Sequence, residues 1–318
     1  MGGMRAALVA LICLSLSGGG AFAQQDWQAP AGVNWRTDTI LSEGTRLAAE
    51  IFSPSDRDGE KLPCILMAHG WGGTVRGLRR DAAVFAKAGY LTVAFDYRGW
   101  GNSGPRVILA NPAPDGKPGK FRAEVIAIRE VVDPVEQGRD WLNALHWLQA
   151  EPMCDTQRIG VWGSSYSGGH VLHAAAHDHR VKAVFSQVGG MDSRFVVASD
   201  EARARTLKEA TQRARGQLPY PAPGAVEVGA LRGAPIREKL MHYAPVELAR
   251  QASHAALMFV IAENEELFDN RDHAIKAHAA ATGVKKLVTL PGIKHYGIYR
   301  EARERAQQLA VEWFDAHL

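Results

Sequence analysis

The chain has 318 residues, of which 46% are hydrophobic and 22% charged, so it is long and apolar enough to bury a sizeable core. The formal net charge is only +3 and no block of like charges occurs, which argues against a nucleic acid as partner. The densest basic stretch, residues 194–215, also carries acidic residues and is typical of a solvated helix face.

Residues 1–23 have the pattern of a secretory signal peptide. Arg5 precedes an apolar run over 6–16 that is short for a membrane span, and residues 17–20 break that run. Small residues at Ala21 and Ala23 then mark a cleavage site. We expect a mature chain of residues 24–318 that has no membrane span and is exported to the periplasm or the medium.

The mature chain alternates apolar strand-like runs with amphipathic helical stretches. Strands are expected over 36–41, 46–52, 63–68, 91–95, 158–162, 181–187, 257–262 and 286–290, and helices over 79–88, 134–150, 166–177, 272–281 and 296–318. Continuous apolar runs separated by helices indicate a mostly parallel sheet covered on both faces, which is the α/β class.

Two long segments interrupt this alternation, and no repeat or linker divides the chain. Residues 101–132 are rich in Gly, Pro and Asn, and residues 191–253 combine a charged helix with a turn-rich stretch. Loops of this length in a compact domain are usually functional. We therefore expect two insertions over the site of a single domain, with 191–253 forming a small cap.

The heptapeptide at 163–169, Gly-Ser-Ser-Tyr-Ser-Gly-Gly, predicts a nucleophile elbow at Ser165. It follows an expected strand and opens an expected helix, and the sharp turn needs small residues two before and two after the serine. Gly163 and Ser167 meet that need, whereas Ser164 would be flanked by Trp162 and Tyr166. The alternative is a Ser/Gly turn without chemistry.

An oxyanion hole requires backbone N–H groups beside the nucleophile. Tyr166, directly after the serine, is one expected donor. The sequence His-Gly-Trp-Gly-Gly at 69–73 follows an expected strand, and its Trp71 is the other. For His69 we expect a structural role in bracing this loop.

His295 is the predicted general base, because it lies between the last expected strand and helix, at the carboxyl edge of the sheet. His173 and His177 have the i, i+4 spacing of some zinc sites, but no Glu lies between them, so we expect no metal there.

Glu265 is the predicted acid, because it comes three residues after the penultimate expected strand and gives the chain order Ser, acid, His. Nearby carboxylates keep this choice open: Glu263, Glu266, Asp269, Asp272 and, after the preceding strand, Asp192.

Together with residues 96–104 and 294–297, these motifs resemble bacterial α/β-hydrolases of the dienelactone-hydrolase-like group and the catalytic domains of X-Pro dipeptidyl-peptidases and cocaine esterases. The resemblance covers residues 35–318. It implies an eight-stranded sheet and cofactor-free hydrolysis of an ester or related acyl bond. It also implies that the third and fifth strands are neighbours, so that a Cys64–Cys154 disulfide can form at the end opposite the site.

The expected activity is cleavage of a carboxylic ester of a small molecule through Ser165, His295 and Glu265. Trp71, Trp100, Tyr166 and Tyr296 are expected to line an apolar substrate pocket. Peptidase or amidase action and acyl transfer would use the same residues, and a non-catalytic binding protein is a further alternative. The oligomeric state stays open.

Overall fold

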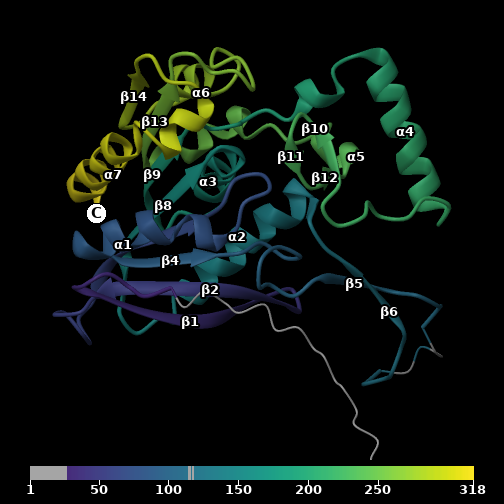
Figure 1. Ribbon diagram of the computed structural model, residues 1–318, viewed down its shortest axis with the longest axis horizontal. Coiled ribbons are helices and arrows are strands. Elements are labelled where there is room, and N and C mark those ends of the chain that lie inside the picture. Colours follow the sequence, from purple (N-terminus) through teal and green to yellow (C-terminus); the bar gives the residue numbers. More distant parts are fainter. Residues whose placement is uncertain (1–26, 114–115, 117) are drawn as a thin grey trace, which may run out of the picture.

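Eight strands form one central sheet in the computed structural model, which describes residues 27–113, 116 and 118–318 (Figure 1). The predicted leader lies outside these residues. The sheet order is β1-β2-β4-β3-β8-β9-β13-β14, and the strands from β4 to β14 run parallel. Their bounds are β1 Val33–Ser42, β2 Thr45–Pro54, β3 Leu62–Ala68, β4 Leu91–Phe95, β8 Cys154–Ser164, β9 Val181–Gln187, β13 Ala256–Ala262 and β14 Lys285–Leu290. The predicted α/β-hydrolase sheet is confirmed.

The antiparallel edge of the sheet is a hairpin of β1 and β2. Its two turn residues, Glu43 and Gly44, have φ values of 45° and 88°. Positive φ at both central positions matches the right-handed twist of the flanking strands. The edge therefore closes with a turn that Gly44 adopts without strain.

Helices cover both faces of the sheet, each over its own apolar core. On one face lie α1 (Arg79–Lys87) and α7 (Arg303–His317), which bury Phe85 and Phe314. On the other lie α2 (Pro134–Leu148), α3 (Tyr166–His177) and α6 (Ala274–Ala280), and Trp141 is fully buried there. The second face is the one on which the inserted segments pack.

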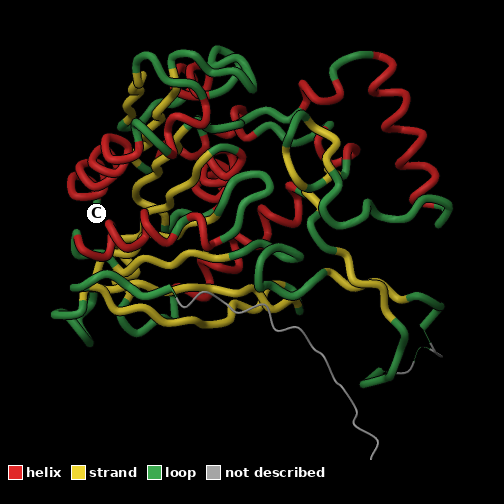
Figure 2. The backbone as a smooth tube through the Cα atoms, viewed as in Figure 1, coloured by secondary structure: helices red, strands yellow, loops and turns green. Residues whose placement is uncertain are grey.

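The 101–132 segment is not the strandless loop that its composition indicates. β5 (Arg106–Leu109) and β6 (Val125–Ile128) form an antiparallel ribbon that projects from the body (Figure 2). Val107 and Ile126 on it are about half exposed. The pattern hid these strands because, of their residues, only Ile128 at the end of β6 is buried. The short β7 (Val131–Val132) pairs with β12 (Ala234–Pro235) of the second inserted segment.

The segment between β9 and β13 contains short elements that do not join the main sheet. In chain order they are η2 Arg194–Val197, α4 Asp200–Ala214, β10 Val226–Val228, β11 Leu231–Arg232, β12, α5 Arg237–Leu240, η3 Pro245–Leu248 and η4 Gln251–His254. We call residues 191–253 the insertion. Its long helix α4 is amphiphilic only weakly, since Thr206 is its one buried residue.

The C-terminal helix differs from its prediction in one respect. Instead of one helix over 296–318, a short 3₁₀ helix η5 (His295–Tyr299) precedes α7, and Arg300 between them has φ −125° and ψ −103°. This non-helical residue redirects the chain, so that η5 stays at the edge of the sheet while α7 packs on its face. A second short 3₁₀ helix, η1 (Val75–Gly77), precedes α1. Within the described residues, no helix has both the length and the apolar character that a membrane span requires.

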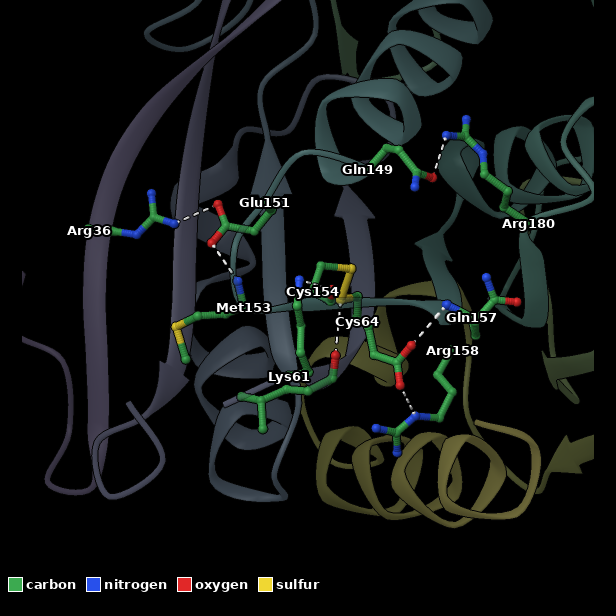
Figure 3. Close-up of a disulfide and its surroundings, with 12 residues drawn as sticks. Arg36, Lys61, Cys64, Gln149, Glu151, Met153, Cys154, Gln157, Arg158 and Arg180 are labelled. Carbon is green, nitrogen blue, oxygen red and sulfur yellow. Dashed lines mark hydrogen bonds and ion pairs between the residues drawn. A yellow bond between two sulfur atoms is a disulfide. The ribbon is translucent and has the colours of Figure 1, made fainter. Parts of the chain in front are cut away.

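A disulfide joins Cys64 on β3 to Cys154 at the start of β8 (Figure 3). Their Cα atoms are 5.7 Å apart, and both residues are buried. Lys61 donates to the carbonyl oxygen of Cys154 beside the bridge. Cys64 pairs with Ile159 on β8, six residues before Ser165, so the bridge lies roughly 20 Å from the elbow at about 3.3 Å per residue.

Removing this bridge should cost stability and leave the distant site intact. For mature protein carrying Cys64→Ala and Cys154→Ala, we expect the free energy of unfolding to fall by about 2–5 kcal/mol, because the cross-link closes a long loop in the unfolded chain. Urea titration of both proteins, with and without reductant, measures this; reductant should shift only the parent. Two thiols reacting with Ellman's reagent in unfolded, unreduced protein would contradict the bridge.

Candidate active site

Ser165 occupies the single residue between β8 and α3, and its backbone is strained. Its φ of 57° and ψ of −124° lie in a region that residues with a side chain rarely adopt. A Cβ at Gly163 would lie 2.2 Å from the carbonyl oxygen of Ser167, so no larger residue fits there. The hydroxyl of Ser167 pairs with that of Tyr97 at 3.1 Å, which explains how serine replaces a second glycine.

Neighbouring backbone holds the strained turn in place. The N–H of Ser165 donates to the carbonyl oxygen of Gln187 at 3.0 Å, and its carbonyl oxygen accepts from Gly168 and Gly190. A Cβ at Gly168 would lie 2.6 Å from the Cα of Gly189. The glycines after the elbow therefore let α3 pack directly on the loop that follows β9.

Three side chains form a hydrogen-bonded line at the carboxyl edge of the sheet. Ser165 Oγ lies 3.0 Å from Nε2 of His295, and Nδ1 of His295 lies 2.8 Å from Oε2 of Glu265. The side chains of His295 and Glu265 are only 1% and 2% exposed. A carboxylate facing Nδ1 fixes the tautomer that leaves the Nε2 lone pair toward the serine.

The other carboxylates near this line have different partners. Glu263 accepts from the N–H of Gly292 at 2.7 Å, and Glu266 accepts from the backbone N–H of His295 at 2.9 Å. Burial raises the pKa of Asp192, but hydrogen bonds from Arg194 outweigh it and hold that pKa below its usual range. Asp269 pairs in the same manner with Arg271. Glu265 is thus the carboxylate that faces the imidazole.

The loop of residues 69–73 lies against the elbow, as an oxyanion loop must. A Cβ at Gly70 would come within 2.9 Å of the Cβ of Ser165. In the described part of the chain, the backbone N–H groups of Trp71 and Tyr166 donate to no other group. Both residues line the cavity in front of Ser165. The indole N–H of Trp71 donates to the carbonyl oxygen of Gly233 in the insertion, at 2.9 Å.

His69 stabilises this loop through contacts with Gly70 and Asp96. Its Nδ1 contacts the carbonyl oxygen of Gly70 at 2.9 Å, and its Nε2 faces Asp96 at 3.7 Å. Burial lowers the pKa of His69 and raises that of Asp96. Asp96 also accepts from the N–H groups of Val75 and Asn102.

A cavity of about 380 Å³ opens in front of Ser165, and its wall is mainly apolar. Trp71, Tyr166 and Tyr296 line it, as the sequence predicted. Sequence reasoning missed the remaining apolar lining, for which no motif or spacing gave a signal. These residues are Phe195, Val196, Val228, Ala230, Leu231, Leu267 and Phe268.

The prediction that Trp100 contacts substrate is wrong for this structure. Its side chain is 2% exposed, and its indole N–H donates to the carbonyl oxygen of Val131 at 3.1 Å. The ring packs under the insertion, where a Cβ at Gly233 would lie 2.4 Å from it. Trp100 supports the floor of the insertion and not the cavity wall.

The histidines of α3 have structural surroundings. Buried His170 contacts the hydroxyl of Tyr243 and the side-chain oxygen of Gln137. His173 and His177 stack with ring centroids 4.2 Å apart. Among the described residues, no three His, Cys, Asp or Glu side chains gather in a group suited to a metal ion.

The model of the X-Pro dipeptidyl-peptidase (S15) family matches residues 43–207, more than half of the chain. The chain belongs to this family. The matched range contains Trp71 and Ser165 and ends before Glu265 and His295.

Proteins of similar sequence or fold match this chain over different lengths. An uncharacterized 31.7 kDa protein in the traX-finO intergenic region of Escherichia coli is 28% identical, over 89% of this chain and 99% of that protein. The quorum-quenching protein AidA of Acinetobacter baumannii is 33% identical over 50% of this chain and 44% of its own length. The solved structure of hypothetical protein PA2218 from Pseudomonas aeruginosa superposes with a TM-score of 0.73 at 23% identity, over 92% of this chain and 96% of that one. The chain is an α/β hydrolase, as the resemblance implied.

The strain at Ser165 predicts a contrast between two substitutions. Ser165→Gly should raise the free energy of unfolding by about 0.5–2 kcal/mol, because relief of about 1–3 kcal/mol of strain exceeds the added entropy of the unfolded glycine. Ser165→Ala keeps a Cβ, so its stability should match that of the parent. Urea unfolding of the three proteins measures the difference. Equal stability of the Gly and Ala variants would show that the turn stores no strain.

Proposed function

We propose that this protein is a serine carboxylesterase, with Ser165 as nucleophile, His295 as general base and Glu265 as the acid of the triad. The observation that carries the proposal is the buried line Glu265–His295–Ser165, which ends at the floor of an apolar cavity. A nucleophile beside a base that a third group orients is the arrangement that covalent acyl catalysis requires.

In the first half of the reaction, Nε2 of His295 takes the proton of Ser165 while Oγ forms a bond to the acyl carbon. The carbonyl oxygen becomes an oxyanion, which the N–H groups of Trp71 and Tyr166 stabilise. When the tetrahedral intermediate collapses, the bond to the alcohol oxygen breaks and the alkoxide takes the proton from His295. The acyl group is then bound to Ser165.

In the second half, water gives a proton to His295 and its oxygen attacks the acyl carbon. Collapse returns that proton to Ser165 and releases the carboxylic acid. The carboxylate of Glu265 accepts the Nδ1–H bond throughout, so it offsets the positive charge on the imidazole in each half.

The cavity favours an ester over a peptide with a free N-terminus. Recognition of an N-terminal ammonium needs an available carboxylate, since a buried charge must be paired. Asp192 and Glu266 are the two carboxylates among the lining residues that the structure describes. The first already binds Arg194 and the second the N–H of His295.

The size and lining of the cavity support an apolar acyl group. A volume of about 380 Å³ is at the small end of the usual range for ligand pockets. The insertion contributes Phe195 and Leu231 to the wall. We propose that the insertion is a cap that encloses an aliphatic or aromatic acyl group of medium length.

We also propose that the protein acts outside the cytoplasm after loss of residues 1–23. The Cys64–Cys154 bridge supports this, because disulfides persist mainly in oxidising compartments.

A panel of p-nitrophenyl esters of rising acyl length, beside aminoacyl anilides, tests the substrate class. We expect turnover of the esters with a maximum at medium length, turnover of the anilides lower by at least about 100-fold, and no activity in Ser165→Ala. Faster cleavage of the anilides would favour a peptidase. Product esters formed on addition of an alcohol would favour an acyltransferase. If neither the esters nor the anilides are cleaved, a binding protein would be favoured.

The acid is tested by a matched pair of substitutions in one loop. Glu265→Gln should lower kcat for the best ester by about 10³–10⁴-fold, because the amide no longer fixes the imidazole tautomer or offsets its charge. Glu263→Gln keeps a side-chain oxygen that can accept the N–H of Gly292, so its kcat should stay near that of the parent. Equal losses in the two variants would assign the loop a purely structural role.

A further inference from the structure

The two loops that carry the nucleophile and the base must keep a fixed position relative to each other. Ser165 lies at the β8–α3 junction, whereas His295 begins η5, which is 130 residues later in the chain. In the described chain, two hydrogen bonds join η5 to this junction. One is the bond between His295 and Ser165 itself, and the other joins Tyr299 to Ser164.

The second bond belongs to a buried chain of polar groups. The hydroxyl of Tyr299 lies 2.7 Å from Oγ of Ser164, which also accepts from Nε2 of Gln187 at 3.0 Å. Ser164 is 2% exposed and Gln187 is 5% exposed. The bridge therefore runs from the end of η5, through the residue before the nucleophile, to the end of β9.

Tyr299 is partly buried, and its phenol stays protonated. Burial raises the pKa of Tyr299 to about 12, although hydrogen bonding to Ser164 acts in the opposite direction. The cavity behind the ring has a volume of about 10 Å³, which is hardly room for one water. If the hydroxyl is removed, solvent cannot easily replace it, and Ser164 keeps only Gln187 as partner.

The remaining contacts of the histidine loop come from the opposite side. Glu265 and Glu266 bind the side chain and the backbone N–H of His295, and both lie on the loop after β13. They fix His295 relative to the acid loop and not relative to the elbow. The Tyr299 bridge supplies the constraint toward the elbow, from the last residue of the five-residue helix that His295 begins.

We propose that Tyr299 is a positioning residue, whose hydroxyl holds η5 against Ser164 and thereby keeps Nε2 of His295 in line with Oγ of Ser165. This inference rests on the proposed function. Loss of the Tyr299 hydroxyl should displace His295 relative to Ser165. A displacement of about 1 Å between reacting groups can slow a reaction by about 100-fold.

Reaction with a fluorophosphonate probe tests this without knowledge of the natural substrate, because Ser165 Oγ displaces fluoride from phosphorus with the help of His295. We expect Tyr299→Phe to slow labelling of Ser165 by about 10- to 100-fold. For the best ester of the panel, kcat per labelled site should fall by the same factor, with KM unchanged.

Tyr90→Phe is the matched control. It also removes a single hydrogen-bonded hydroxyl from a tyrosine, here a buried one that bonds Asp315 away from the site, so it should lower stability by a similar amount and leave labelling unchanged. Ser164→Ala removes the other end of the bridge. Its effect on the labelling rate should not add to that of Tyr299→Phe, because both break one interaction.

The outcomes separate the two proposals. If the parent protein is not labelled at Ser165, the proposed function fails. If the parent is labelled and folded Tyr299→Phe reacts at the parental rate, or Tyr90→Phe slows labelling equally, the positioning role of Tyr299 is overturned.

Discussion

The backbone at Ser165 changes from strand to helix within one residue, and the rest of the site is arranged around that turn. Strain of this kind persists only where the surroundings hold it. Here the Gln187 carbonyl, the Gly190 amide and the close approach of α3 to Gly189 act together. Val188 beside them also has a positive φ, of 41°, which is rare for a β-branched residue. The ends of the adjacent strands β8 and β9 thus hold the strained turn together. This turn presents the serine hydroxyl to the cavity.

The position of the loop that carries His295 is fixed in a different way. This loop has no comparable backbone strain at His295, so its position depends on side chains that reach it from the loop after β13. Glu263, Glu265 and Glu266 each bind a different group of this loop. Three neighbouring carboxylates would repel one another if they were left unpaired. Because two of them accept backbone N–H bonds and one faces the imidazole, they act as a clamp and not as a surface acidic patch.

Features that depend on neighbouring residues could be predicted from the sequence, whereas features that depend on distant residues could not. The elbow at Ser165 and the oxyanion loop at Trp71 are short motifs whose steric needs are visible in their own residues, so their places were predictable. Glu265 was chosen by counting residues from the end of the penultimate strand, and in the structure Glu265 faces His295. Trp100 was misplaced because an aromatic residue after a strand has the same pattern in a cavity wall and in a core. Tyr299 gave no signal, since its partner Ser164 is 135 residues away.

The cavity marks the limit of local prediction most clearly. Its floor is made by the elbow and the oxyanion loop, but much of its wall comes from the insertion, where short elements follow no strong periodicity. The match to the family model ends within helix α4 of this insertion. The insertion also contacts the catalytic floor directly, through the bond from the Trp71 indole to Gly233. The insertion therefore shapes the cavity and also supports, through Trp71, the loop of residues 69–73. Under the proposed function, this hydrogen bond would couple selection of the acyl group to stabilisation of the oxyanion.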